Sequence, residues 1–120
     1  MHLPHQQKTA SGFRSLSVGA LGISSITEAE LLYGVEKSQH SEKNRLALAH
    51  FLLPIEIVPF GSAAAHKYSV IRSDLEKAGN VIGPLDMLIA AQAKSIGATL
   101  ITNNEHEFLR VKGLKVENWV

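Results

Sequence analysis

Cysteine is absent from this 120-residue sequence. The chain therefore has neither disulfide bonds nor thiolate zinc sites, which agrees with a reducing compartment such as the cytoplasm. Long apolar runs are missing as well, because the longest nearly apolar stretch, 87–93, contains Gln92 and falls far short of the ~20 residues of a membrane span. We therefore expect a cytoplasmic protein without a membrane anchor.

An excess of charge of one sign is also missing. The chain has 12 basic and 11 acidic residues and a formal net charge of +1, so no field of the whole molecule draws it to nucleic acid or anionic lipid. Any contact with nucleic acid must be local. The length and the 45% hydrophobic content are those of one small globular domain.

What the sequence does contain is an alternation of short apolar runs with amphipathic segments. The runs predict strands at 21–26, 55–58, 98–102 and 115–118, and the segments between them predict helices at 27–37, 41–53, 62–78, 84–96 and 105–110. This alternation predicts an α/β fold with a mainly parallel sheet. Residues 1–12 show neither period, and we expect them to be poorly ordered, ahead of a domain at 13–120.

Three acidic positions fall at predicted helix starts, near the carboxyl ends of strands where α/β folds bind ligands. They are Glu30, Asp86 and the segment 104–107. Each also has a purely structural explanation. Glu30 can form a capping box with Thr27, and Asp86 and Glu107 can each be stabilised by a helix dipole.

If the fold brings these acids close together, they can form a binding site. Two ionised carboxylates about 4 Å apart repel by roughly 4 kcal/mol at an effective dielectric of 20, so a cluster must bind a proton or a cation. Oxygen ligands select Mg²⁺ or Mn²⁺, and these ions serve phosphoryl transfer.

Four segments together resemble the VapC toxins, which are PIN-domain ribonucleases of bacterial toxin–antitoxin pairs. They are Ile23-Ser-Ser-Ile-Thr-Glu-Ala-Glu30 with its continuation to Ser38, Gly83-Pro-Leu-Asp86-Met-Leu-Ile-Ala-Ala91, Leu100-Ile-Thr-Asn-Asn104-Glu-His-Glu107-Phe-Leu-Arg-Val111, and Asn118-Trp119. The resemblance covers about residues 13–120, in order and at the spacing of the family.

The resemblance implies a PIN-like three-layer fold, in which helices flank a mainly parallel central sheet. It also implies a Mg²⁺- or Mn²⁺-dependent endoribonuclease, with transfer RNA as the substrate of similar toxins. A VapB-type antitoxin would be the partner, and PIN domains of this kind usually pair as homodimers.

The resemblance further assigns roles to particular residues. Glu30 matches the family's second acidic position and Asp86 the third, while Glu107 matches the acid before Phe. Asn104 stands where many relatives have Asp, and Thr102 matches a polar residue near the site. We therefore expect Glu30, Asp86 and Glu107 to be catalytic, and these three with Asn104 to hold the metal.

One family feature is missing. VapC proteins begin with a short apolar strand that ends in Asp-Thr-Asn and supplies the first metal ligand, whereas no acidic residue precedes Glu28 here. We expect the first central strand to be absent and the nuclease activity to be impaired. The alternative is a degenerate, inactive protein that only binds its antitoxin. A phospho-accepting receiver domain fits poorly, because Asp86 follows Pro84 inside a helix start rather than ending a strand.

Overall fold

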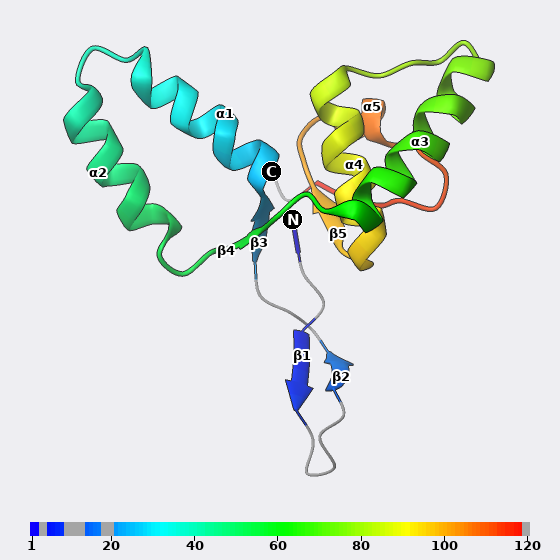
Figure 1. The fold of residues 1–120 in the computed structure, drawn as a ribbon, viewed down its shortest axis with the longest axis horizontal. Helices are drawn as coiled ribbons and strands as arrows, with labels where there is room; N and C mark the ends of the chain where they lie inside the picture. Colours follow the sequence, from blue (N-terminus) through cyan, green and yellow to red (C-terminus); the bar gives the residue numbers. More distant parts are fainter. Residues whose placement is uncertain (3–4, 9–13, 18–20, 119–120) are drawn as a thin grey trace.

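The computed structural model describes residues 1–2, 5–8, 14–17 and 21–118. Two pairs of short parallel strands lie near the middle of the molecule (Figure 1). These are β3 (Gly22–Ser24) with β4 (Glu56–Val58), and β5 (Thr99–Ile101) with β6 (Lys115–Glu117). Parallel neighbours need crossover connections, and helices supply them between the strands of both pairs. The prediction of an α/β fold with mainly parallel strands is confirmed, and the parallel strands form two two-stranded sheets.

Met1 and His2 lie between the two strand pairs. The His2 N–H donates to the Thr99 carbonyl at 2.7 Å, the Thr99 N–H donates back at 3.0 Å, and the Gly22 N–H donates to the Met1 carbonyl at 2.8 Å. His2 runs antiparallel to both neighbours. Two residues that run antiparallel to their neighbours thus lie between β3 and β5, and they join these strands near their amino-terminal ends.

A β-hairpin lies within and just after the range that was expected to be poorly ordered. β1 (His5–Lys8) pairs antiparallel with β2 (Arg14–Ser17). Figure 1 shows this hairpin extending away from the parallel strands. A hydrophobic period arises where one face of an element is buried against a core. A hairpin that projects from the core has no such buried face, so its sequence need not show the period. The domain boundary at residue 13 stays a prediction.

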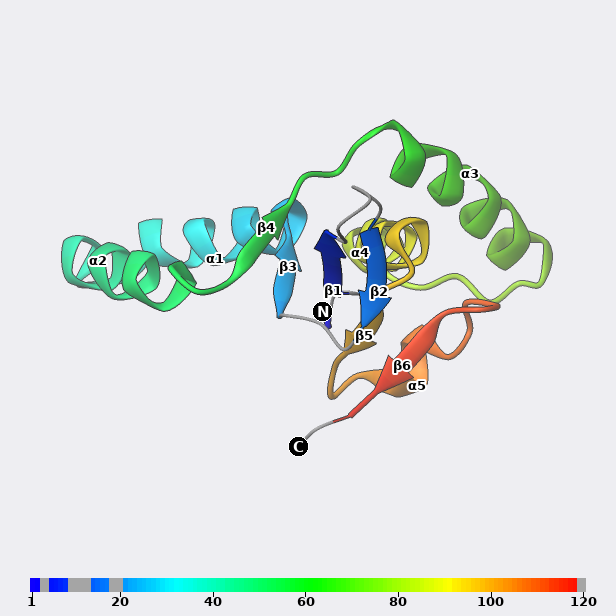
Figure 2. The same cartoon turned by 90° about the horizontal axis from the view of Figure 1, so that it is seen from below.

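The connection from β3 to β4 is a pair of helices, α1 (Ser25–Glu36) and α2 (Ser41–Leu52). Neither helix contains a buried residue. Figure 2 shows the pair on one side of the parallel strands, with the other two long helices on the opposite side. We call α1, α2 and the turn between them the α1–α2 hairpin.

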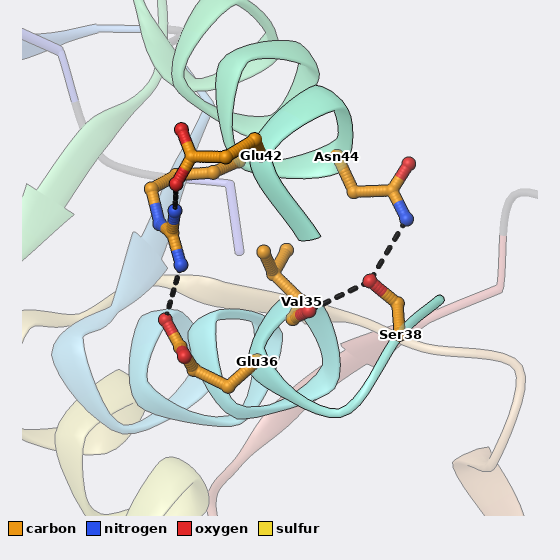
Figure 3. Close-up of polar contacts among 6 residues, drawn as sticks. Val35, Glu36, Ser38, Glu42 and Asn44 are labelled. Carbon is orange, nitrogen blue, oxygen red and sulfur yellow. Dashed lines mark hydrogen bonds and ion pairs between the residues drawn. The ribbon is translucent and has the colours of Figure 1, made fainter. Parts of the chain in front are cut away.

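Polar contacts link the two helices of this hairpin (Figure 3). The guanidinium of Arg45 on α2 pairs with Glu36 on α1 at 2.5 Å and also with Glu42 one turn away. Near the turn, the Asn44 amide donates to the Ser38 hydroxyl at 2.9 Å. Exposed pairs of this kind contribute little to stability, so the hairpin is held together weakly.

The core lies on the other side of the strands, where α3 (Ser62–Lys77) packs against α4 (Pro84–Ile96). Short α5 (Glu105–Phe108) adds Phe108 to it. The core cluster consists of Ile71, Leu75, Ile82, Met87, Ala90, Ala91, Ala93, Ala98, Leu100, Phe108 and Val111. Three alanines of α4 are fully inaccessible to solvent, which indicates that neighbouring elements approach this helix closely.

Several local predictions are confirmed by the backbone. Pro84 occupies the first position of α4, where its missing N–H is not needed. Gly97 ends the same helix in the left-handed region at φ 68°, and Gly79 does so after α3 at φ 65°.

The predicted start of α1 is wrong by two residues. The helix begins at Ser25, and the Ser24 side chain caps it by accepting from the Ile26 N–H at 3.0 Å. Thr27 is therefore inside the first turn, and the capping box between Thr27 and Glu30 does not form. The sequence Ser-Ser-Ile-Thr contains three hydroxyl groups that can each cap a helix. Ser24 is the residue that caps α1, and its side chain is buried.

Two further points concern the sequence predictions. None of the helices in the described ranges is both long and apolar enough to cross a membrane. Trp119, which contributes to the family resemblance, lies outside the described residues.

Candidate functional site

Two of the three predicted acids meet in the structure. Asp86 lies in the first turn of α4 and Glu107 lies on α5, and their carboxyl groups are close enough to shift each other's pKa. Gly83 lies against both of them: a Cβ atom at this position would be 3.6 Å from Asp86 Oδ2 and from Glu107 Oε1. The fold therefore brings two separate helix starts together at one point. We call Asp86 and Glu107 the acid pair.

The Glu107 carboxylate is held from both sides. The Gly83 N–H donates to Glu107 Oε1 at 2.7 Å, and the Asn104 side-chain amide donates to Oε2 at 2.8 Å. Asn104 is positioned in turn by Thr102, whose hydroxyl accepts from the Asn104 N–H at 3.0 Å. Both predicted polar residues after β5 thus act on the position of Glu107.

The surroundings shift the pKa values of the two carboxyl groups in opposite directions. Burial raises the pKa of Asp86, and the neighbouring charge of Glu107 raises it further. The Gly83 N–H and then the Asn104 amide lower the pKa of Glu107, because both donate to its ionised form. The site therefore favours the protonated form of Asp86 and the ionised form of Glu107.

An acid pair of this kind binds either a proton or a cation. Its donors are all oxygen atoms, which suits a hard divalent cation better than a soft one. Among the residues that the structure describes, no group of three His, Cys, Asp or Glu side chains is arranged to hold a metal ion. The acid pair thus fits two ligand positions of a divalent cation site and leaves others to further groups.

Glu30 lies apart from the acid pair. It is exposed, on α1, and it is not among the groups that shift the pKa of Asp86 or of Glu107. Thr27, one turn earlier on the same face of α1, does line a cavity that Asp86 also lines. Glu30 is thus one helical turn beyond the wall of that cavity.

This cavity has a volume of about 250 Å³ and lies between β3 and β5. Its lining residues are Met1, Ile23, Ser24, Thr27, Asp86, Ile89, Leu100, Ile101, Thr102 and Phe108. The apolar members come mainly from the strands and the core. Of the polar members, Ser24, Thr27 and Thr102 end or follow β3 and β5, and Asp86 comes from the first turn of α4. The predicted placement of polar groups beyond the carboxyl ends of parallel strands matches this lining.

One residue that supports the site was not predicted to have a role. Gln92 on α4 is only 1% exposed, accepts from the Ser24 hydroxyl, and donates to the Val58 and Pro59 carbonyls at 2.6 and 2.9 Å. It therefore ties the ends of β3 and β4 to the helix that carries Asp86. Its signal in the sequence was that it alone is polar within 87–93.

Comparison with known families identifies the class of protein. A sequence model of the PIN domain matches residues 4–114, which is most of the chain. The chain is therefore a PIN-domain protein.

Comparison with individual proteins narrows this assignment. The chain is 42% identical over 105 residues to the tRNA(fMet)-specific endonuclease VapC of Shigella flexneri, covering 88% of this chain and 80% of the relative. It is also 46% identical over 99 residues to ribonuclease VapC2 of Rickettsia felis, covering 82% of this chain and 74% of that protein. The chain belongs to the VapC family, the ribonuclease toxins of type II toxin–antitoxin systems.

Solved structures agree with this assignment. The crystal structure of VapBC2 from Rickettsia felis bound to a DNA fragment from its promoter superposes with a TM-score of 0.81 at 44% identity, covering 84% of this chain and 76% of that one. PIN-domain ribonucleases are generally metal-dependent, and the oxygen donors around the acid pair are compatible with that chemistry.

Proposed function

We propose that this chain is a metal-dependent endoribonuclease whose reaction takes place at the acid pair. The observation that supports this proposal most strongly is that the carboxyl groups of Asp86 and Glu107 meet at Gly83, beside a cavity at the carboxyl ends of β3 and β5. Two acids held against each other at the expected end of a parallel sheet are difficult to explain by helix capping alone.

In this proposal Asp86 and Glu107 are ligands of Mg²⁺ or Mn²⁺. Asn104 is a further ligand or holds Glu107 in place, and Thr102 orients Asn104. Glu30 would complete the set from α1, across the cavity wall formed by Thr27. A bound Mg²⁺ or Mn²⁺ would position the phosphodiester and stabilise negative charge on its oxygens.

The relatives suggest the substrate and the partners. One is named as an endonuclease specific for tRNA(fMet), and we propose transfer RNA as the substrate of this chain. Several solved relatives are complexes with VapB, and we propose a VapB-type antitoxin as the inhibitor of this chain and the cytoplasm as its location. A homodimer is the proposed assembly.

Cleavage of RNA by an Asp86→Asn variant tests this function. We expect activity with Mg²⁺ or Mn²⁺ in the unaltered chain and a loss of at least about 100-fold in the variant, since a missing catalytic carboxylate costs this much or more. Glu56→Gln is the matched control, because Glu56 is an exposed acid on β4 that lines neither cavity. Calorimetric titration with Mn²⁺ measures ion binding separately from cleavage. Equal activity of Asp86→Asn and the unaltered chain would show that the site is wrong.

The second candidate function is an inactive protein that binds only the antitoxin. Two observations favour it: Met1 and His2 bring no acid to the space between β3 and β5, and the described residues offer no three-ligand group. This candidate predicts a stable complex with a VapB-type partner, and no RNA cleavage at any Mg²⁺ concentration. Cleavage that disappears in Asp86→Asn would exclude it.

A further inference from the structure

A second cavity lies on the side of the molecule that carries the core. It has a volume of about 440 Å³, between the carboxyl-terminal half of α3, the end of α4 and the turn 110–112. Four cationic side chains line it, Lys77, Lys94, Arg110 and Lys112. We call it the basic cavity. Asp74 is the acid among its lining residues.

This concentration of charge contrasts with the chain as a whole. The cavity collects four of 12 basic residues and one of 11 acidic residues, although the chain carries a formal net charge of only +1. In the described part of the chain, no salt bridge within 4.0 Å involves any of the four cations. Cations brought together without such partners repel one another, so their arrangement is favourable when an anion lies among them.

Helix dipoles explain only part of the arrangement. Lys77 and Lys94 lie in the last turns of α3 and α4, where a positive charge is favourable. Arg110 and Lys112 follow the short helix α5 and lie outside the last turn of any long helix. Arg110 also has a structural explanation, because its charge lowers the pKa of Glu107, so a purely structural account leaves Lys112 unexplained.

Two of the cations are fixed in place by backbone carbonyls. The Lys94 ammonium donates to the Lys112 carbonyl at 2.6 Å, and the Arg110 guanidinium donates to the Val81 carbonyl at 3.1 Å. Each of these contacts uses one N–H, whereas an ammonium has three and a guanidinium has five. The two groups are thus held in position and still have donors for a ligand.

Arg110 connects the basic cavity with the acid pair, because it lines the cavity and its charge lowers the pKa of Glu107. Arg110 binds Val81, and the short segment 81–83 leads from there to the Gly83 N–H that holds Glu107. Three residues span at most about 11 Å. A polynucleotide strand that has one phosphodiester at the acid pair can therefore carry a neighbouring phosphate into the basic cavity.

The lining also suits more than a free phosphate ion. Ile71, Leu75 and Val111 form an apolar part of the wall, and the volume falls within the usual range of small-ligand pockets, about 300–1,000 Å³. An apolar surface beside cationic groups is the combination that receives an unstacked base together with its phosphate.

We propose that the basic cavity binds the sugar–phosphate backbone of the RNA substrate, and one unstacked base, next to the cleavage position. This proposal rests on the proposed ribonuclease function and deepens it, because it names residues away from the acid pair that hold the substrate.

RNA binding in the presence of EDTA tests the proposal, because binding is then measured without cleavage. The probe is a fluorescein-labelled single-stranded RNA, and its dissociation constant is measured from 50 to 200 mM salt. In Lys77→Gln/Lys112→Gln we expect weaker binding, and a slope of log K against log salt that is smaller by about 0.7 per cation, or about 1.4 for the pair. Both lysines are exposed, so the variant keeps the buried core.

The matched control is Lys37→Gln/Lys43→Gln, which removes the same charge from the exposed face of the α1–α2 hairpin. A slope that changes equally in both double variants would overturn the proposal. So would unchanged RNA binding with weakened binding of a VapB-type partner, which would make the cavity a protein interface.

Cleavage assays with Mg²⁺ separate this proposal from the proposed function. If the unaltered chain cleaves RNA and the cavity variant binds RNA as tightly as the unaltered chain does, the proposal of RNA binding in the basic cavity is wrong and the proposed nuclease function stands. If the cavity variant binds RNA more weakly and no chain cleaves RNA, the proposal of RNA binding in the basic cavity is supported and the proposed nuclease function is wrong.

Discussion

The two sides of the parallel strands differ in how they use their apolar residues. On the side of α3 and α4, residues such as Ile71 and Leu75 are 5% exposed and belong to one continuous core. On the α1–α2 hairpin, Leu46 and Phe51 are 70% and 62% exposed, and no residue of either helix is buried. Similar residue types therefore contribute very different free energies, because only burial away from water stabilises.

The overall dimensions reflect this difference. The radius of gyration is 15.9 Å, whereas a compact domain of this length has one of about 14 Å. Figures 1 and 2 show the reason, because the α1–α2 hairpin and the hairpin of β1 and β2 both reach away from the parallel strands, while α3 and α4 lie against each other. One side is a packed domain, and the other is an extension from it.

The proposed ligands are divided between these two sides. Asp86 and Glu107 belong to α4 and α5 on the packed side, where the core and Gly83 hold them in contact. Glu30 belongs to the hairpin, which has no core of its own. The acid pair is therefore preorganised by packing, while the distance of Glu30 from it depends on an element that is held by polar surface contacts.

The largest expected difference compares the same substitution on the two sides. Leu75→Ala should lower the free energy of unfolding by about 2–5 kcal/mol, because it leaves a cavity in the core beside α4. Leu46→Ala should change it by less than about 0.5 kcal/mol, because the side chain is 70% exposed. Urea denaturation followed by circular dichroism measures both. Equal losses would show that the hairpin packs against the rest of the molecule in solution.

A smaller effect is expected at the link between the strands and α4. Gln92→Met keeps the size of the side chain but removes the partners of the Ser24 hydroxyl and of the Val58 and Pro59 carbonyls. We expect a loss of about 1–3 kcal/mol, since buried polar groups without partners carry this cost. Gln39→Met, at an exposed position after α1, is the control in the same denaturation experiment. A Gln92→Met variant as stable as its control would show that these hydrogen bonds are replaced.

The packed side is also the side that the sequence predicts best. Pro84 and Gly97 mark both ends of α4 correctly, because their backbone preferences act locally. The apolar stripe of α3 likewise predicts the buried face that contains Ile71 and Leu75. On the hairpin side the predicted cap at Thr27 fails, because Ser24 is selected by burial against Gln92, which is a contact between distant parts of the chain.

The same limit applies to the candidate site. Local sequence places Asp86 and Glu107 at helix starts, but their contact depends on how α4 and α5 pack. The position of Met1 and His2 between β3 and β5 was not predictable either, because two residues are too few to show a strand period. Only the family resemblance relates these distant segments before a structure is known.

The smallest effect on stability is expected from the polar contacts of the hairpin. Arg45→Ala removes the ion pair with Glu36 that bridges the two helices at 2.5 Å, and its exposure predicts no measurable change in the midpoint of global unfolding. Amide hydrogen exchange should nevertheless become several-fold faster in α1 and α2, because a hairpin without buried residues opens locally when its surface contacts are lost.

Arg72→Ala provides the control for this last comparison. It removes an exposed pair with Glu76 at 3.2 Å, but this pair lies within α3, which is packed against α4. Exchange in α3 should therefore stay as slow as in the unaltered chain, because opening that helix requires exposure of the core. Unchanged exchange in the hairpin of Arg45→Ala, together with faster exchange in α3 of Arg72→Ala, would contradict the comparison. The hairpin would then be held by more than its surface contacts, and Glu30 would be as firmly positioned as the acid pair.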